Sequence, residues 1–397
     1  MDKKKRTVMS NVDENRGNLI KLSHFIHDNP EIGMKEYKAV DAIEKLLAAN
    51  GISMKKNIAG METAFQTTVI GGRPGPGPHI ALLAEYDALE GIGHGCGHNI
   101  IATCSTGAFL AVAKEIKDLA GKVSLIGTPA EEALGSKSIL VNKGIFDDVD
   151  YALMIHPTAG TNLINRSARA TTSLRIHYIG KAAHSAMPQN GINALSAAIE
   201  LFNGIDRLRS TFLLSDNVNG VILDGGKAAN VIPEESTCLF SIRTKTVIEM
   251  NALTDKIRRA AEAAAMLIGT KVEITQGNVL YERYTNLPMS EAFKHNMEAL
   301  GEKMNYADNT KFYGSSDIGN VSVHIPIIHD YLNISAKPVN EHSTDFANDA
   351  ISPRADEICI KGAKGLAMTV IDILESTALR KKINEYQKIT VPRAYIE

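Results

Sequence analysis

Short runs of consecutive apolar residues alternate with helical patterns through the first part of the chain. Three of these runs predict strands that are buried on both faces: residues 79–85, 123–127 and 151–155. An alanine-rich pattern over residues 99–119 predicts a helix between the first two runs, and an earlier helix is predicted over residues 11–28. Strands that alternate with helices predict an α/β fold with a central, mostly parallel sheet flanked by helices. In such a sheet, functional groups gather at the carboxyl ends of the strands.

The pattern changes near residue 170. Residues 172–179 alternate between polar and apolar side chains, with Leu174, Ile176 and Tyr178 on one face, as in a half-buried strand. A helix, two strands, a helix and a strand are predicted next, at residues 192–209, 220–224, 235–243, 247–268 and 271–275. This βαββαβ order is typical of a ferredoxin-like α+β sandwich. Helical and strand patterns then resume and end in a long helix over residues 354–379.

The sequence therefore predicts that one domain is inserted into another. Residues 1–168 and 285–397 form the α/β domain, and residues 169–284 form the inserted α+β domain. A chain of 397 residues, 44% hydrophobic and 22% charged, is long enough and apolar enough to build both cores.

Composition excludes several classes of function. The net charge of −2 gives no strong field for nucleic acid or an anionic membrane, so neither partner is expected. Residues 3–6 are basic, but no apolar stretch of the length that secretion needs follows them, and no run of about 18 apolar residues predicts a membrane span. Four scattered cysteines are too few for a disulfide framework and are expected to be reduced. These features predict a cytoplasmic protein.

The densest group of reactive side chains follows the first predicted strand. Asp87, Cys96 and His98 lie within one glycine-rich segment, just before the helix predicted from residue 99. Thiolate and imidazole are the usual zinc ligands, and glycines let the backbone turn both toward one point. For this segment alone, a buried cysteine and a helix-capping histidine remain an equally good interpretation.

The next two strands end in further candidate ligands. Glu131 and Glu132 follow the second strand, and His156 follows the third. A solvated acidic loop would explain two adjacent carboxylates that stood alone, but three successive strands that end in metal-capable residues favour a metal site. Adjacent carboxylates also suit a division of labour, in which one binds metal and the other takes a proton from water.

Three residues of the inserted domain are further candidates. His184 lies in a loop after a strand, Asn230 lies in a glycine-rich loop, and Arg243 ends a strand. An imidazole, an amide and a guanidinium can bind an oxyanion and a substrate carboxylate, although loop histidines are often simply exposed. His342, in the last part of the chain, is one more loop histidine.

The order and spacing of these motifs resemble the dinuclear-metal amidohydrolases and peptidases. That family includes aminoacylases, hippurate and indole-acetyl-amino-acid hydrolases, carnosine-type dipeptidases and aminobenzoyl-glutamate hydrolases. The resemblance covers nearly the whole chain and rests on Asp87–Leu89, His94–Asn99, Pro129–Glu132, Gly180–Pro188, Gly226–Pro233 and His342. The segments Tyr86–Leu89 and Gly314–Ser322 are most similar to the dipeptidase and aminobenzoyl-glutamate hydrolase branch.

The resemblance implies a zinc-exopeptidase-like catalytic domain and a role for each candidate. It implies that two metal ions are bound by Cys96, His98, Glu132, His156 and His342. Glu131 would be the general base, and Asp87 would orient a ligand. His184 would stabilise the oxyanion from the partner subunit, because the inserted domain of this family is a lid and a dimerisation surface. Asn230 and Arg243 would hold the substrate.

Two positions differ from many members of that family. Glu85-Tyr86-Asp87 stands where many relatives have His-x-Asp, and Asn99 stands where many have aspartate. The first difference is expected where a cysteine takes over a ligand position.

The expected activity is hydrolysis of the amide bond in a dipeptide or an N-acyl amino acid. The expected cofactors are two divalent ions, with zinc favoured by the thiolate and manganese or cobalt tolerated by the carboxylates. A homodimer formed through the inserted domain is expected, and a tetramer is equally compatible. Two other hypotheses stay open: a catalytically silent metal-binding or substrate-binding protein of the same fold, and a cysteine hydrolase that uses Cys96 with His98.

Overall fold

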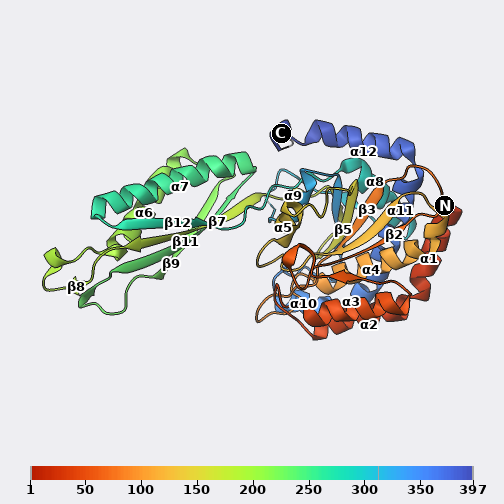
Figure 1. Cartoon of the computed structure of the whole chain (residues 1–397), viewed down its shortest axis with the longest axis horizontal. Coiled ribbons are helices and arrows are strands. Elements are labelled where there is room, and N and C mark those ends of the chain that lie inside the picture. The colour runs from red at the N-terminus through yellow and green to blue at the C-terminus, as the bar shows by residue number, and fades with distance from the viewer. Residues whose placement is uncertain (1, 312, 396–397) are drawn as a thin grey trace. The chain divides into compact units, whose positions relative to one another are not determined.

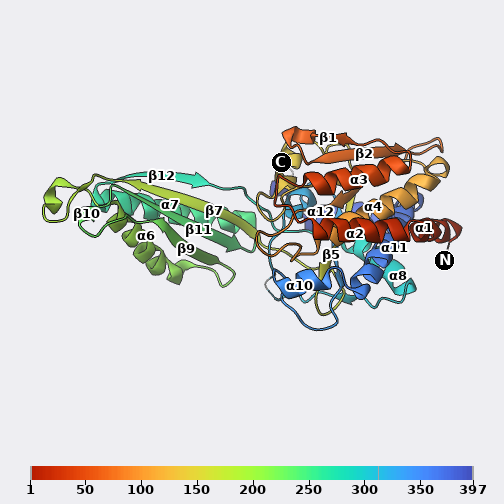
Figure 2. The same cartoon turned by 90° about the horizontal axis from the view of Figure 1, so that it is seen from below.

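The chain folds into two compact units. The structure is a computed structural model that describes residues 2–311 and 313–395. The first unit comprises Met1–Ser167, Arg283–Lys311 and Asn320–Glu397, and the second comprises Ala168–Glu282 and Phe312–Gly319. Each unit contains its own sheet (Figures 1 and 2).

The first unit is built on an eight-stranded sheet. In spatial order its strands are β1 (Lys55–Lys56), β2 (Phe65–Ile70), β4 (Lys122–Gly127), β3 (His79–Ala84), β5 (Tyr151–Thr158), β14 (Ile327–Asn333), β6 (Leu163–Ile164) and β13 (Asn305–Tyr306). The central strands β4, β3, β5 and β14 are all parallel, whereas β2 joins β4 in the antiparallel direction. The predicted α/β class, a mostly parallel sheet flanked by helices, is therefore confirmed.

One helix forms the centre of this unit. Helix α4 (His98–Glu115) is buried from His98 to Val112, because small and apolar side chains lie all around it and its first lysine is Lys114. It packs against β3, β4, β5 and the long helix α11 (Pro353–Glu375). Helices α1 (Lys3–Glu14) and α2 (Arg16–Asp28) pack on α4 from outside, as Figures 1 and 2 show. The other helices of this unit are α3 (Tyr37–Ala49), α5 (Ser136–Asn142), α8 (Leu287–Ala299), α10 (Thr344–Asp349) and α12 (Thr377–Thr390), and the short helix α9 (Ile318–Ser322) begins in the second unit and ends in the first.

Two predicted helices are interrupted. The helix predicted over residues 11–28 is two helices that meet at Asn15, whose side chain donates to the Asn11 carbonyl. The helix predicted over residues 354–379 ends at Glu375, because Ser376 leaves the helical conformation and its hydroxyl caps α12 by accepting from the Leu379 amide. The helical spacing of apolar residues continues across both interruptions, so the sequence pattern does not predict them.

The second unit is a four-stranded antiparallel sheet with two helices. The spatial order is β12 (Lys271–Gln276), β7 (Ala170–Ile179), β11 (Glu235–Thr244) and β9 (Asn217–Asp224). Helices α6 (Ala194–Leu208) and α7 (Val247–Ile268) lie side by side on one face (Figure 1). This is the ferredoxin-like arrangement that the βαββαβ order predicts. A short ribbon, β8 (Ala183–His184) with β10 (Val231–Ile232), is separate from the main sheet.

Two composition-based expectations can be compared with the structure. All four cysteines have free thiols. Among the described residues, no helix is both long and apolar enough to cross a membrane.

Candidate metal centre

The ends of three neighbouring strands bring candidate ligands together at the carboxyl end of the central sheet. Cys96 and His98 follow β3, Glu132 follows β4, and His156 lies near the end of β5. The Cys96 sulfur, an imidazole nitrogen of His98 and a carboxylate oxygen of Glu132 all lie within 4.8 Å of one another. Gly97 makes the turn between the first two residues possible, because its φ is +70° and a Cβ atom there would lie 2.8 Å from Pro157 Cγ.

Asp87 fixes two members of this group. One carboxylate oxygen accepts a hydrogen bond from His98 Nδ1 at 3.0 Å, and the other accepts from the Glu132 backbone amide at 3.0 Å. The second imidazole nitrogen of His98, Nε2, is buried and has no hydrogen-bond partner among the described residues. His98 therefore presents Nε2 for binding while Asp87 holds its other nitrogen.

The two remaining predicted ligands lie at the margin of the group. His342 Nε2 is 3.8 Å from a carboxylate oxygen of Glu132, and the His342 backbone amide donates to the Gly95 carbonyl at 2.9 Å. His342 is 59% exposed and has a positive φ of 62°. The His156 ring is half-buried and meets the His98 ring edge-on, with 5.9 Å between their centroids.

Burial and charge act against each other at these side chains. Burial lowers the pKa of His98, but Asp87, Glu85 and Glu132 outweigh burial and raise this pKa well above its usual value. Burial raises the pKa of Asp87, but the charge of His98 reverses this effect and lowers it. Burial and the Glu132 carboxylate together raise the pKa of the Cys96 thiol. The protein alone thus holds protons on Cys96 and His98, and a metal ion would have to displace them.

Two other histidines near the motifs, His94 and His329, are buried and belong to none of the candidate ligand groups among the described residues. His94 is buried and its Nε2 atom hydrogen-bonds to the Ile26 carbonyl at 3.1 Å. Burial lowers the pKa of His94 to about 3, so this imidazole is neutral. His329 is buried on β14 beside Arg283 and Tyr331, and burial lowers its pKa well below the usual value.

The second unit places its candidates in two locations. His184 pairs with Val231 in the β8–β10 ribbon, and the Ser185 amide donates to the Asn230 carbonyl at 3.0 Å, so His184 and Asn230 are neighbours. The loop of Asn230 lines a cleft of 520 Å³ with Ser185. Arg243 lies near the other end of β11, about 26 Å along the strand from Glu235, the residue nearest the ribbon in the chain, at about 3.3 Å per residue. Within this unit, Arg243 does not join His184 and Asn230.

The first-unit residues fit a divalent metal ion. Thiolate, imidazole and carboxylate are the ligand types that zinc prefers, and three of them converge within 4.8 Å. The His98 Nε2 atom has no hydrogen-bond partner among the described residues, and the carboxylates of Glu85 and Glu132 lie 3.4 and 3.8 Å from it, so a cation bound by this nitrogen would lie among negative charges.

Comparison with known proteins finds peptidases and hydrolases that match nearly the whole chain. The chain is 31% identical to a mouse Xaa-Arg dipeptidase, over 96% of this chain and 91% of that protein. It is 25% identical to a p-aminobenzoyl-glutamate hydrolase chain from Escherichia coli, with 97% and 95% coverage. The peptidase dimerisation domain of the M20 family matches residues 166–266. The chain belongs to the M20 peptidase family.

The fold agrees with a solved M20 structure. The Bacillus subtilis YXEP protein, described as a dinuclear metal binding peptidase, superposes with a TM-score of 0.67 at 19% identity, covering 91% of this chain and 99% of that one. The predicted resemblance is therefore confirmed. The M20 protein is an enzyme of a family of metal-dependent hydrolases, as expected from its sequence.

Two buried residues beside the candidate ligands are given no role by the sequence motifs. Glu85 follows β3 directly and has a carboxylate oxygen within 4.8 Å of one on Glu131. Lys137, near the start of α5, is 0% exposed, and its ammonium lies 2.6 Å from Glu85. The sequence marks Glu85 because it stands where many relatives have the histidine of His-x-Asp. No sequence pattern around Lys137 distinguishes it from a surface lysine.

Proposed function

We propose that this M20 enzyme hydrolyses the amide bond of a dipeptide or an N-acyl amino acid at the centre formed by Cys96, His98 and Glu132. The observation that carries the proposal is the convergence of these three ligand types beside a second carboxylate, Glu131, in a chain related to dipeptidases over nearly its whole length. Two divalent ions, with zinc favoured, would be held by these three residues together with His156 and His342. When bound, such ions lower the pKa of water toward about 7 and polarise the scissile carbonyl.

Glu131 is the general base in this proposal. It is adjacent to Glu132 in the chain, and successive side chains point in different directions, so one carboxylate can bind metal while the other takes a proton. Glu131 accepts the proton of the attacking water on a carboxylate oxygen and then delivers it to the leaving amine nitrogen. Asp87 keeps the His98 ring in one orientation throughout, through its hydrogen bond to Nδ1.

The second unit supplies substrate contacts in this proposal. His184 donates a hydrogen bond to the oxyanion, and Asn230 and Arg243 hold the carbonyl or carboxylate of the substrate. The separation of Arg243 from the ribbon supports a homodimer, in which ribbon and arginine reach one site from different subunits. The match of the dimerisation domain to residues 166–266 supports the same arrangement. A cytoplasmic location is part of the proposal, because Cys96 must stay reduced to bind metal.

A dipeptide with a carboxyl-terminal arginine is the favoured substrate. The relative named an Xaa-Arg dipeptidase has higher identity than the p-aminobenzoyl-glutamate hydrolase relative, 31% against 25%. The two substrates carry opposite charges on the carboxyl-terminal residue, so a small panel separates them. Xaa-Arg and Xaa-Lys dipeptides, p-aminobenzoyl-glutamate and N-acetyl amino acids would be compared by kcat/KM.

The test combines that panel with metal analysis. Metal per chain is measured by elemental analysis, and hydrolysis is measured before chelation, after chelation and after metal return. Close to two ions per chain, with activity that is lost and restored, supports the proposal. Bound metal with no turnover of any substrate would favour a silent binding protein, and activity that resists chelation would favour the cysteine hydrolase.

A further inference from the structure

A buried ion pair lies next to the candidate ligand His98. Glu85 and Lys137 are both fully buried, and the Lys137 ammonium lies 2.6 Å from Oε1 of Glu85. The other oxygen of Glu85, Oε2, is buried and has no hydrogen-bond partner among the described residues. Lys137 therefore satisfies one side of the carboxylate, and the other side faces the site.

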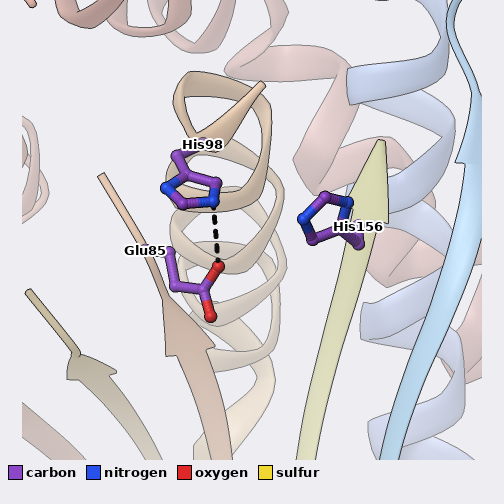
Figure 3. Close-up of side chains that lie close together, drawn as sticks. All are labelled: Glu85, His98 and His156. Atoms are coloured by element: carbon purple, nitrogen blue, oxygen red, sulfur yellow. Dashed lines mark ion pairs between the residues drawn. The ribbon is translucent and has the colours of Figure 1, made fainter. Parts of the chain in front are cut away.

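Glu85 Oε2 and His98 Nε2 face the same space. Figure 3 shows the carboxylate below the His98 ring, with the His156 ring beside them, and the two atoms are 3.4 Å apart. Ligand atoms of Glu85, His98 and His156 all lie within 4.8 Å of one another. Because Asp87 occupies His98 Nδ1, Nε2 is the nitrogen left to bind an ion.

The separation fits two ligands of a single ion. Two atoms that each lie about 2.0–2.1 Å from a tetrahedral zinc are about 3.3–3.4 Å apart. The Glu85 to His98 distance of 3.4 Å meets this value, whereas Glu132 Oε1 is 3.8 Å from the same nitrogen. Before any adjustment of side chains, Glu85 is thus better placed beside His98 than a ligand that the resemblance implies.

We propose that Glu85 is an additional metal ligand of this chain and that Lys137 is the residue that positions its carboxylate. The inference rests on the metal centre of the proposed function. Glu85 stands where many relatives have the histidine of His-x-Asp. The ligand set implied by the resemblance contains only two anionic ligands, Cys96 and Glu132, for two dications, and Glu85 would be a third anionic ligand, whose other oxygen is paired with Lys137.

Metal binding, rather than activity, tests this role. Metal-free wild type, E85Q, and the double variant E85Q/K137M are titrated with Zn²⁺ against a chromophoric chelator and with Co²⁺ by visible absorption. We expect E85Q to weaken the Kd of one ion by about tenfold or more, and to change the Co²⁺ ligand-field bands. The thiolate-to-Co²⁺ band should persist in E85Q and disappear in C96S, because that band reports Cys96 alone.

The double variant separates a ligand from a structural ion pair. E85Q leaves the Lys137 charge buried beside a neutral amide, so it can lose stability for reasons unrelated to metal. E85Q/K137M removes both charges and keeps the test valid if E85Q does not fold. A ligand role predicts that metal affinity stays weak in the double variant even where the melting temperature recovers. Wild-type affinity and wild-type Co²⁺ bands in the double variant would overturn the proposal.

A second carboxylate provides the matched control. Glu302 is paired with Lys361 at 2.8 Å in the same unit and belongs to none of the candidate ligand groups among the described residues. E302Q should bind both ions as the wild type does. A wild-type chain that binds neither Zn²⁺ nor Co²⁺ would overturn the proposed function and this inference together. Metal binding that E85Q leaves unchanged would overturn the inference alone.

Discussion

The two units of this M20 enzyme use polar side chains in opposite ways. In the first unit, Glu85, Asp87, His98 and Lys137 are almost completely buried and contact one another at the end of the sheet. In the second unit, His184 and Asn230 are exposed at a short ribbon, and His184 Nδ1 accepts a local hydrogen bond from the Ala186 amide at 3.0 Å. The first group is held in place within its own unit, and the second is not.

This difference supports the proposal that the first unit holds the metal ions and that the second unit contacts the substrate. Buried groups that fix one another can hold metal ions in a set geometry, because each side chain is oriented by a neighbour. Exposed groups on a ribbon gain partners only when a substrate or another subunit reaches them. Substitutions of these four buried groups should therefore change metal binding, whereas substitutions of His184 or Asn230 should change turnover with metal content preserved.

The largest effect is expected at Glu131. E131Q should lower kcat by about 10²–10⁴-fold, because the amide cannot accept a proton from water. Metal content, measured by elemental analysis, should stay near two ions per chain. E132Q is the matched control and should lose metal together with activity. Loss of metal in E131Q and retention in E132Q would show that the two roles are reversed.

The second largest effect is expected at His184. H184A should lower kcat by about 10²–10³-fold, the range found when one oxyanion donor is removed. Metal content should not change, because His184 lies outside the first unit. H177A is a suitable control, since His177 belongs to the same unit and bonds to the Thr237 hydroxyl at 3.0 Å. An unchanged kcat in H184A would remove the oxyanion role and break the division proposed between the units.

Substitution of Asp87 should have a smaller effect, which lowers the affinity for metal more than it lowers kcat at saturating metal. Asp87 accepts two hydrogen bonds with two oxygens, whereas asparagine offers one acceptor oxygen, so D87N must lose one of them. We expect D87N to weaken metal affinity by about 10–100-fold in a chelator competition, with most of the kcat recovered at saturating metal. Full metal affinity in D87N would mean that His98 and Glu132 are held by other contacts.

The fold could be predicted where apolar runs are uninterrupted. Strands β3, β4 and β5 are continuous apolar segments, and the alternation of Leu174, Ile176 and Tyr178 marks β7. Strand β14 was not predicted, because His329 and Asp330 interrupt its apolar sequence even though both are buried. Burial of polar residues depends on partners distant in the chain, which a local pattern does not contain.

The candidate ligands could be proposed from motifs, whereas the buried charge pair beside them could not. Cys96, His98 and Glu132 stand out because each follows a recognisable strand. Lys137 does not, because its burial depends on Glu85, 52 residues earlier in the chain. The distance between Arg243 and the ribbon could not be predicted from the sequence either, because it depends on the length of β11 and on the strands with which β11 pairs.

The smallest effect is expected at a buried carboxylate that belongs to none of the candidate ligand groups among the described residues. Asp330 on β14 accepts hydrogen bonds from the Ser290 hydroxyl at 2.9 Å and the Asn165 amide at 3.3 Å, and burial raises its pKa to about 7. The unfolded pKa is about 3.9, so the folded state binds the proton more tightly, and the stability gained from that proton is lost as pH rises from about 4 through 7. D330N cannot titrate but keeps one acceptor oxygen. The melting temperature of the wild type minus that of D330N should therefore fall by a few degrees between pH 5 and pH 8, at fixed metal concentration. A difference that stays constant over this range would show that Asp330 keeps one protonation state, while unchanged activity in D330N would confirm that burial of a polar group in the first unit does not by itself make it part of the site.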